Sequence, residues 1–134
     1  SQAAFAEDIE IKDCLVAGPV TRGGRNLLHR DPVEVLIVNG KWAAPTENNE
    51  IAGTSTRWRK TPSNKDGWIE SPAFSGGYAY AAVNVNEPTI MVLEAAGHNL
   101  VYVNGLPRTG DPYSYGTVKL PVALKSGTNE LLFE

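Results

Sequence analysis

Few residues in this chain are of the types that carry out nucleophilic or acid–base catalysis. The histidines are His29 and His98, and the one cysteine is Cys14. Nucleophilic catalysis needs a nucleophile beside a base that a third group orients. Neither histidine has a nucleophile turn nearby, and no Gly-x-Ser-x-Gly is present. The 15 Asp and Glu residues could supply a carboxylate pair for glycoside cleavage, but none stands in a distinctive setting. We therefore predict that the chain is not an enzyme.

Two segments combine aromatic rings with planar hydrogen-bonding groups, which is the mixture that sugar binding requires. Sugar rings present apolar C–H faces bordered by hydroxyls, and flat rings with polar neighbours recognise both. The candidate ligand-binding residues in these segments are Trp58, Trp68, Arg108, Asp111, Tyr113 and Tyr115. Each also has a structural interpretation. The tryptophans would fill the core, the tyrosines would cover one end of the fold or pack on a neighbouring domain, and Arg108 would pair with Asp111.

Calcium is the one metal for which the sequence offers candidate ligands. Asp8, Glu10 and Glu134 would meet if the first and last strands lay side by side. Calcium needs several converging oxygen atoms, and spacing in the sequence does not establish convergence. We therefore predict no bound cofactor or metal, with calcium as the alternative.

The charge balance argues against several classes of partner. The formal net charge is −3, and Lys and Arg are scattered, so no basic stripe is available for nucleic acid. No apolar run approaches the length that crosses a membrane. Three arginines lie between Thr21 and Asp31. They form either an anion site or a solvated loop that pairs with local carboxylates.

The apolar pattern predicts short β-strands separated by turns. Gly, Pro and Asn recur at intervals of about 8–12 residues, which is typical of a β-sandwich or barrel. No apolar set recurs at helical spacing over three turns. We expect a hairpin between strands 90–93 and 100–103, and a long irregular segment over 43–66 that Trp42 and Trp58 anchor. The expected strands are 9–16, 33–38, 68–69, 78–85, 90–93, 100–103, 118–124 and 131–133.

The length predicts one domain. A chain of 134 residues removes roughly two-thirds of its unfolded surface from water, so it folds without staples. Cys14 has no partner for a disulfide, and its apolar neighbours predict a buried, inert thiol. Residues 1–6 are either a leader remnant, because Ala4-Phe5-Ala6 has the form of a signal-peptidase site, or a linker. We expect residues 7–134 to be one domain cut from a longer exported chain.

The second half of the sequence resembles galactose-binding-like jelly-roll domains. In that family a strand ends in Asn-Gly, and a later Leu-x-x-Gly-x-Asn closes the sandwich. The matching segments here are 101–105 (Val-Tyr-Val-Asn-Gly), 120–122 (Leu-Pro-Val) and 124–132 (Leu-Lys-Ser-Gly-Thr-Asn-Glu-Leu-Leu). Residues 16–19 (Val-Ala-Gly-Pro) are similar to the opening of such domains where they precede secreted hydrolases, and Trp58 and residues 78–80 are similar to aromatic landmarks of the middle. Many members carry Asp-rich residues in the hairpin, where this chain has 96–99 (Ala-Gly-His-Asn), and this departure weakens a calcium or ligand site there.

This resemblance implies an all-β jelly-roll β-sandwich that serves as a non-catalytic accessory module of a larger secreted or periplasmic hydrolase. The expected partner is either carbohydrate or the neighbouring catalytic domain of the parent protein. The alternative is a purely structural interdomain module, which mediates protein interaction without a ligand. We expect Asn104-Gly105 to form a left-handed turn. Asn104, Gly127 and Asn129 are then expected to be architectural. A binding function would then have to lie in the loop over 106–117.

Overall fold

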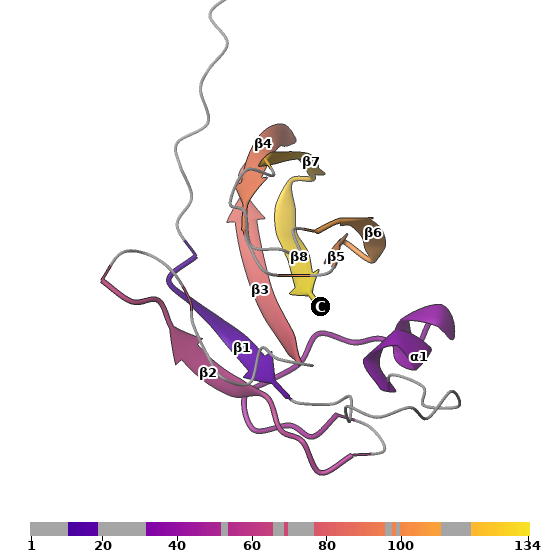
Figure 1. Ribbon diagram of the computed structural model, residues 1–134. Helices are drawn as coiled ribbons and strands as arrows, with labels where there is room; N and C mark the ends of the chain where they lie inside the picture. Colours follow the sequence, from indigo (N-terminus) through magenta and orange to yellow (C-terminus); the bar gives the residue numbers. More distant parts are fainter. Residues whose placement is uncertain are drawn as a thin grey trace, which may run out of the picture.

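The computed structural model describes residues 11–18, 32–51, 54–65, 69, 77–95, 98, 100–110 and 119–134. This part of the chain forms antiparallel sheets with one short helix, which confirms the all-β class (Figure 1). The elements are β1 (Asp13–Ala17), α1 (Pro32–Val38), β2 (Arg59–Pro62), β3 (Tyr78–Val85), β4 (Thr89–Glu94), β5 (Leu100–Val103), β6 (Leu106–Thr109), β7 (Lys119–Leu124) and β8 (Gly127–Phe133).

The strands form a six-stranded sheet in the order β2-β1-β3-β8-β5-β6 and a two-stranded sheet of β4 and β7. Figure 1 shows β4 and β7 together at one end of the molecule, near β3 and β8, and α1 toward the other end. Successive side chains of a strand point to opposite faces. One face of the larger sheet shares a core with β7, in which Val83, Val101 and Leu131 cluster with Val122 and Leu124.

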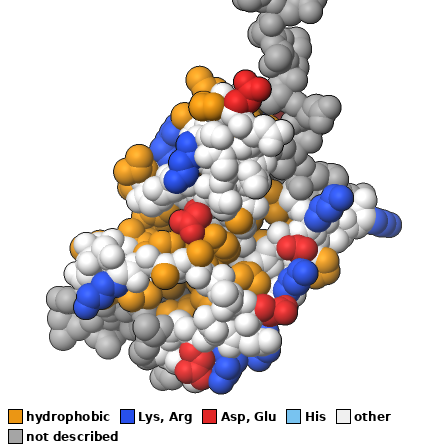
Figure 2. Space-filling model, turned by 180° about the vertical axis from the view of Figure 1, so that it is seen from behind, with side chains coloured by type: hydrophobic (Ala, Val, Ile, Leu, Met, Phe, Trp, Pro, Cys, Tyr) orange, Lys and Arg blue, Asp and Glu red, His pale blue; other side chains and the backbone are white. Residues whose placement is uncertain are grey.

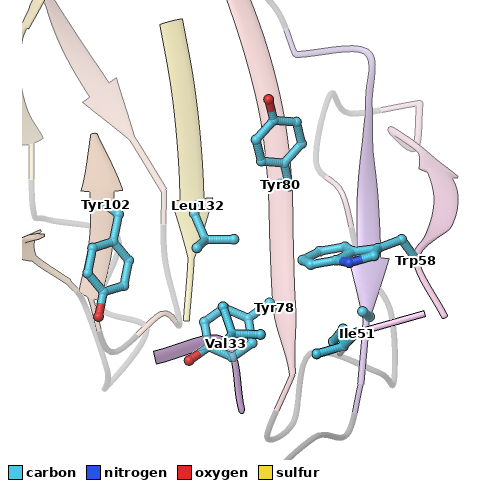
Figure 3. Packing of buried hydrophobic residues seen from close by; sticks show 8 residues of the cluster. Val33, Ile51, Trp58, Tyr78, Tyr80, Tyr102 and Leu132 are labelled. Carbon is cyan, nitrogen blue, oxygen red and sulfur yellow. The ribbon is translucent and has the colours of Figure 1, made fainter. Parts of the chain in front are cut away.

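The opposite face of the larger sheet is rich in aromatic residues, and we call it the aromatic face. It carries Tyr78, Tyr80, Tyr102 and Leu132, which belong to one buried cluster. Figure 3 shows these side chains projecting to the same side of the sheet. Residues from α1 and from the segment that follows it pack on this face.

The strand predicted over 33–38 is wrong, because these residues form α1. Pro32 occupies the first helical position, where a missing N–H leaves no bond unmade. Val33 is 0% exposed, and Ile37 packs on the same cluster one turn later. The Lys41 N–H donates to the Leu36 carbonyl and the Gly40 N–H to the Ile37 carbonyl, while Gly40 has φ +67°. This Schellman cap ends the helix at Asn39-Gly40. Among the described residues, no helix has the length and apolar character needed to cross a membrane.

The predicted hairpin between 90–93 and 100–103 is also wrong. Both segments are strands, but β4 pairs with β7, whereas β5 pairs with β6 and β8. Asn104 and Gly105 have φ values of +50° and +83° and join β5 to β6. Positive φ at both central residues is the mark of a type I′ turn, so the predicted left-handed turn is confirmed. Its consequence is that residues 106–109 form a strand and not the start of a loop.

The segment predicted to be irregular over 43–66 contains β2, which pairs with β1. Ile69 is not in a strand, and Trp68 lies outside the described residues. The strand over 78–85 has the predicted bounds. The calcium hypothesis required the first and last strands to be neighbours, but β3 lies between β1 and β8. Asp8 and Glu10 lie outside the described residues.

Candidate functional site

The structure does not bring the predicted ligand-binding residues together where it describes them. Trp58 precedes β2 at one edge of the larger sheet, and Arg108 is in β6 at the other edge. Five strand spacings of about 4.8 Å separate these edges, or roughly 24 Å along the sheet. Trp68, Asp111, Tyr113 and Tyr115 lie outside the described residues.

Trp58 is a core residue. It is 3% exposed, and its backbone N–H donates to the Asn49 carbonyl at 2.9 Å. Its neighbours point outward: Arg57 Nη2 lies 2.8 Å from Glu50 Oε1, and Arg59 Nη1 donates to Asn48 Oδ1. The chain around Trp58 is therefore a small hairpin that holds the indole inside and uses its arginines on its own surface. This placement matches the structural interpretation of Trp58.

Arg108 connects the two sheets. Its Nη2 donates to the carbonyl of Pro121 at 3.1 Å. Proline cannot donate to a neighbouring strand and is therefore tolerated at a strand edge. Pro121 is opposite Val92 in the β4–β7 pairing, and the exposed guanidinium satisfies its carbonyl. A structural role for Arg108 is therefore visible.

The cysteine and the histidine in the described part of the chain are buried. Cys14 lies in a cluster with Val16 and Ala79, and burial, with a smaller contribution from Asp13, raises the pKa of its thiol to about 11. The thiolate is the reactive form, so Cys14 is the buried, unreactive thiol that the sequence predicts. His98 is buried against Phe133 in an edge-to-face contact, with ring centroids 5.3 Å apart. His29 lies outside the described residues.

A row of side chains crosses the aromatic face from one edge of the sheet to the other. Residues in register on antiparallel neighbours share a face, and the pairings link β2, β1, β3, β8, β5 and β6 in turn. The leucine and tyrosine residues of this row lie on the inner strands, and a lysine lies on β2 at the edge of the sheet. In order, the row is Lys60, Leu15, Tyr80, Leu132, Tyr102 and Pro107.

Trp42, from the segment after α1, packs against Tyr80 of this row and is not fully buried. Its ring centroid is 6.3 Å from that of Tyr80, at an interplanar angle of 52°, and 6.3 Å from that of Trp58, at 70°. These are tilted and edge-to-face contacts, not face-to-face stacks. Trp42 is partly exposed, so the aromatic face offers indole surface to solvent.

Glu130 is the acid beside the aromatic row. It lies two residues before Leu132 in β8, on the same face of the sheet and opposite Ala82 of β3. Its side chain is half-buried. The Tyr80 hydroxyl donates to Glu130 Oε1 at 3.1 Å. In Figure 3 the Tyr80 hydroxyl points along β3, away from Trp58. Burial, followed by the charge of Glu130 and this hydrogen bond, raises the pKa of Tyr80 to about 12. Tyr80 is therefore a neutral donor at ordinary pH.

Figure 2 shows the molecule from behind, with hydrophobic side chains gathered across the middle and an acidic side chain among them. At the β1–β2 edge, Lys60 Nζ lies 3.7 Å from Asp13 Oδ2. Both side chains are about half exposed, so this pair contributes little stability. We call Trp42, Tyr80 and Glu130, with the apolar row between them, the candidate site.

Sequence reasoning identified only part of this site. The sequence predicts Trp42 as an anchor and residues 78–80 as an aromatic landmark. Glu130 lies inside the motif that resembles the jelly-roll family, and the pattern of that motif does not single it out as a site residue. The hydrogen bond between Tyr80 and Glu130 joins residues 50 positions apart. The alternation of residues within one strand cannot show which other strand lies beside it.

Replacing Tyr80 with phenylalanine is expected to lower the free energy of unfolding by about 1–2 kcal/mol at pH 8, because the Glu130 carboxylate loses its donor. The folded protein holds the pKa of Tyr80 above that of the unfolded chain. This contribution is therefore complete below pH 10 and is lost as pH rises toward 12. Urea unfolding at pH 8 and pH 11 measures both effects. If the free energy of unfolding fell by the same amount between pH 8 and pH 11 in wild type and in Tyr80→Phe, the assigned Tyr80–Glu130 hydrogen bond would be contradicted.

A second apolar surface lies on the outer side of the two-stranded sheet. Ile90 is 73% exposed and Val92 55% exposed. They are opposite Ala123 and Pro121 respectively, and these two residues are also exposed. The surface is thus a short apolar stripe on β4 and β7.

No group of three or more potential metal ligands occurs among the described residues. The candidate site combines an aromatic surface, a neutral phenol donor and a carboxylate, which suits recognition of a ligand that has both apolar and hydrogen-bonding parts. Searches of protein-family models, of curated proteins and of solved structures found no match to this chain.

Proposed function

We propose that this chain is a non-catalytic accessory module of a larger exported hydrolase and that it binds glycan on its aromatic face. The proposed architecture is a jelly-roll β-sandwich of the galactose-binding-like type. The antiparallel sheets, the shared core between them and the Asn104–Gly105 turn support it. The observation that carries the binding function is the partly exposed Trp42 beside the Tyr80–Glu130 pair.

The chemistry of the candidate site fits a sugar ring. An indole surface packs on the apolar C–H face of a pyranose, while neighbouring polar groups bond its hydroxyls. Glu130 has acceptor capacity beyond the one bond from Tyr80. A half-buried acceptor next to an apolar floor selects a ligand with a donor close to an apolar face, and sugars combine these features.

Trp42→Ala is expected to weaken glycan binding by about tenfold, because the loss of an aromatic contact costs about 1.4 kcal/mol. Calorimetric titration against a panel of neutral and charged oligosaccharides measures the loss, and circular dichroism checks that the variant is folded. Ile90→Ala is the matched control, since it removes apolar surface from the other sheet. Titrations without saturation across the panel would contradict the proposal. A loss in Tyr113→Ala or Tyr115→Ala but not in Trp42→Ala would place the site in the 111–118 segment.

The alternative function is a structural interdomain module, and the apolar stripe on β4 and β7 favours it. Two large exposed aliphatic side chains at alternate positions of β4 share one face and form a surface suited to protein contact. The two functions differ in what they require. A structural module shows no saturable glycan binding, while an accessory glycan binder shows it with the isolated domain.

A further inference from the structure

Among the described charged residues around the candidate site, a negative charge is left without an ion-pair partner. In the described part of the aromatic face, Lys60 is paired with Asp13, so their charges largely offset each other. Glu130 makes no ion pair with any described residue. Its side chain accepts a hydrogen bond from the neutral hydroxyl of Tyr80. The candidate site therefore presents one carboxylate that forms no ion pair with a described residue.

Glu130 is partly buried and has hydrogen-bonding capacity that its bond from Tyr80 does not fill. A carboxylate removed from water loses hydration, and one neutral hydrogen bond replaces only part of it. A carboxylate has about four lone-pair positions, and Tyr80 occupies one of them. Tyr80 stays protonated at ordinary pH. Its hydroxyl therefore continues to donate to Glu130 when a ligand binds to the remaining lone pairs of the carboxylate. An incoming cation would supply both the missing charge and further donors.

The aromatic rings favour the same sign of charge. Trp42 and Tyr80 meet at 52° with centroids 6.3 Å apart, and the negative potential of ring faces attracts a cation within about 6 Å. Tyr80 touches both partners, since its ring contacts Trp42 and its hydroxyl contacts Glu130. A positively charged group at Glu130 would thus lie beside the hydroxyl of the ring that contacts Trp42, whereas an anionic sugar would be repelled.

We infer that the candidate site selects a cationic ligand, namely a glycan that carries protonated amino groups, with one ammonium bound at the Glu130 carboxylate. This inference rests on the proposed function, because it specifies the class of glycan at the same site. It goes beyond that proposal by excluding acidic sugars and by ranking an amino sugar above its N-acetylated counterpart, in which the charge is absent.

Glucosamine oligomers and N-acetylglucosamine oligomers of equal length provide the test, titrated by calorimetry at a pH where the amine is protonated. The amino oligomer is expected to bind at least tenfold more tightly, and added salt should reduce this advantage. Glu130→Gln keeps an acceptor for Tyr80 but removes the charge, so the two oligomers should then bind within about threefold of each other. Glu94→Gln, a change to an exposed acid of β4, is the control and should retain the difference. A thermal melt confirms that each variant is folded.

Equal binding of the two oligomers to wild type would overturn the cationic preference and leave the glycan proposal standing. A second probe, tetramethylammonium, tests for a cation site that does not bind glycan. Its binding is followed by the indole N–H signals in NMR. If no oligosaccharide binds but tetramethylammonium shifts these signals in wild type and not in Glu130→Gln, the cation site is supported and the glycan proposal is overturned. No response to either probe overturns both.

Discussion

Replacing Asn129 with alanine is expected to lower the free energy of unfolding by about 3–5 kcal/mol, one of the two largest effects predicted for this protein. Asn129 is 0% exposed. Its Oδ1 accepts from the Lys125 N–H at 3.0 Å and from Asn104 Nδ2 at 2.9 Å. Its Nδ2 donates to the Lys125 and Gly127 carbonyls at 2.9 and 3.2 Å. Removal leaves several of these groups without partners inside the protein.

Urea denaturation of wild type and variants measures this effect. Thr128→Ala is the matched control, because Thr128 is the neighbouring residue on the same strand and is exposed. We expect it to change stability by less than about 0.5 kcal/mol. Asn104 Oδ1 also accepts from the Glu130 N–H at 2.8 Å, so Asn104→Ala and Asn129→Ala should not be additive. A cost below about 1 kcal/mol for Asn129→Ala would contradict the assigned network.

Replacing Trp58 with alanine is expected to cost about 3–5 kcal/mol, as for other large buried aromatic residues. Trp58 belongs to the cluster that contains Val33 and Ile51, and it contacts Trp42 edge to face. Alanine would leave a cavity between the helix, the small hairpin and the sheet. The interpretation of Trp58 as a ligand-binding residue predicts a different result, namely little change in stability without ligand.

Chemical denaturation without ligand distinguishes these outcomes for Trp58. Trp58→Phe should cost less than Trp58→Ala, because phenylalanine fills part of the space. Arg57→Ala is a control in the same hairpin, where an exposed ion pair with Glu50 is removed. We expect a change of about 1 kcal/mol or less for Arg57→Ala. A stable Trp58→Ala variant would return Trp58 to the ligand-binding candidates.

Local patterns predicted the elements whose causes are local. The alternation over 78–85 gave a strand with the observed bounds, and Asn104-Gly105 gave the I′ turn because few residues accept two positive φ values. The helix α1 was missed because its β-branched residues favour a strand. Packing of Val33 and Ile37 on the aromatic face, with Pro32 at the start and a glycine cap at the end, outweighed that preference.

Pairing between distant segments could not be predicted from local pattern. The apolar runs at 90–93 and 100–103 are close in sequence, which favoured a hairpin, yet each pairs with a later strand. The candidate site depends on the same information. Tyr80 and Glu130 meet only because β8 lies beside β3, and no residue type in either strand specifies that neighbour.

The position of β8 also governs how the protein can fold. β8 is the last described strand in the sequence, but it lies between β3 and β5 in the sheet. Before β8 is inserted, the larger sheet consists of two separate parts, β2-β1-β3 and β5-β6, each with an unpaired edge. Such edges template association between chains, and pairings of long sequence separation form slowly. Folding intermediates that lack β8 should therefore be the species most prone to aggregate, and insertion of this strand joins the two parts and pairs the free edges of β3 and β5.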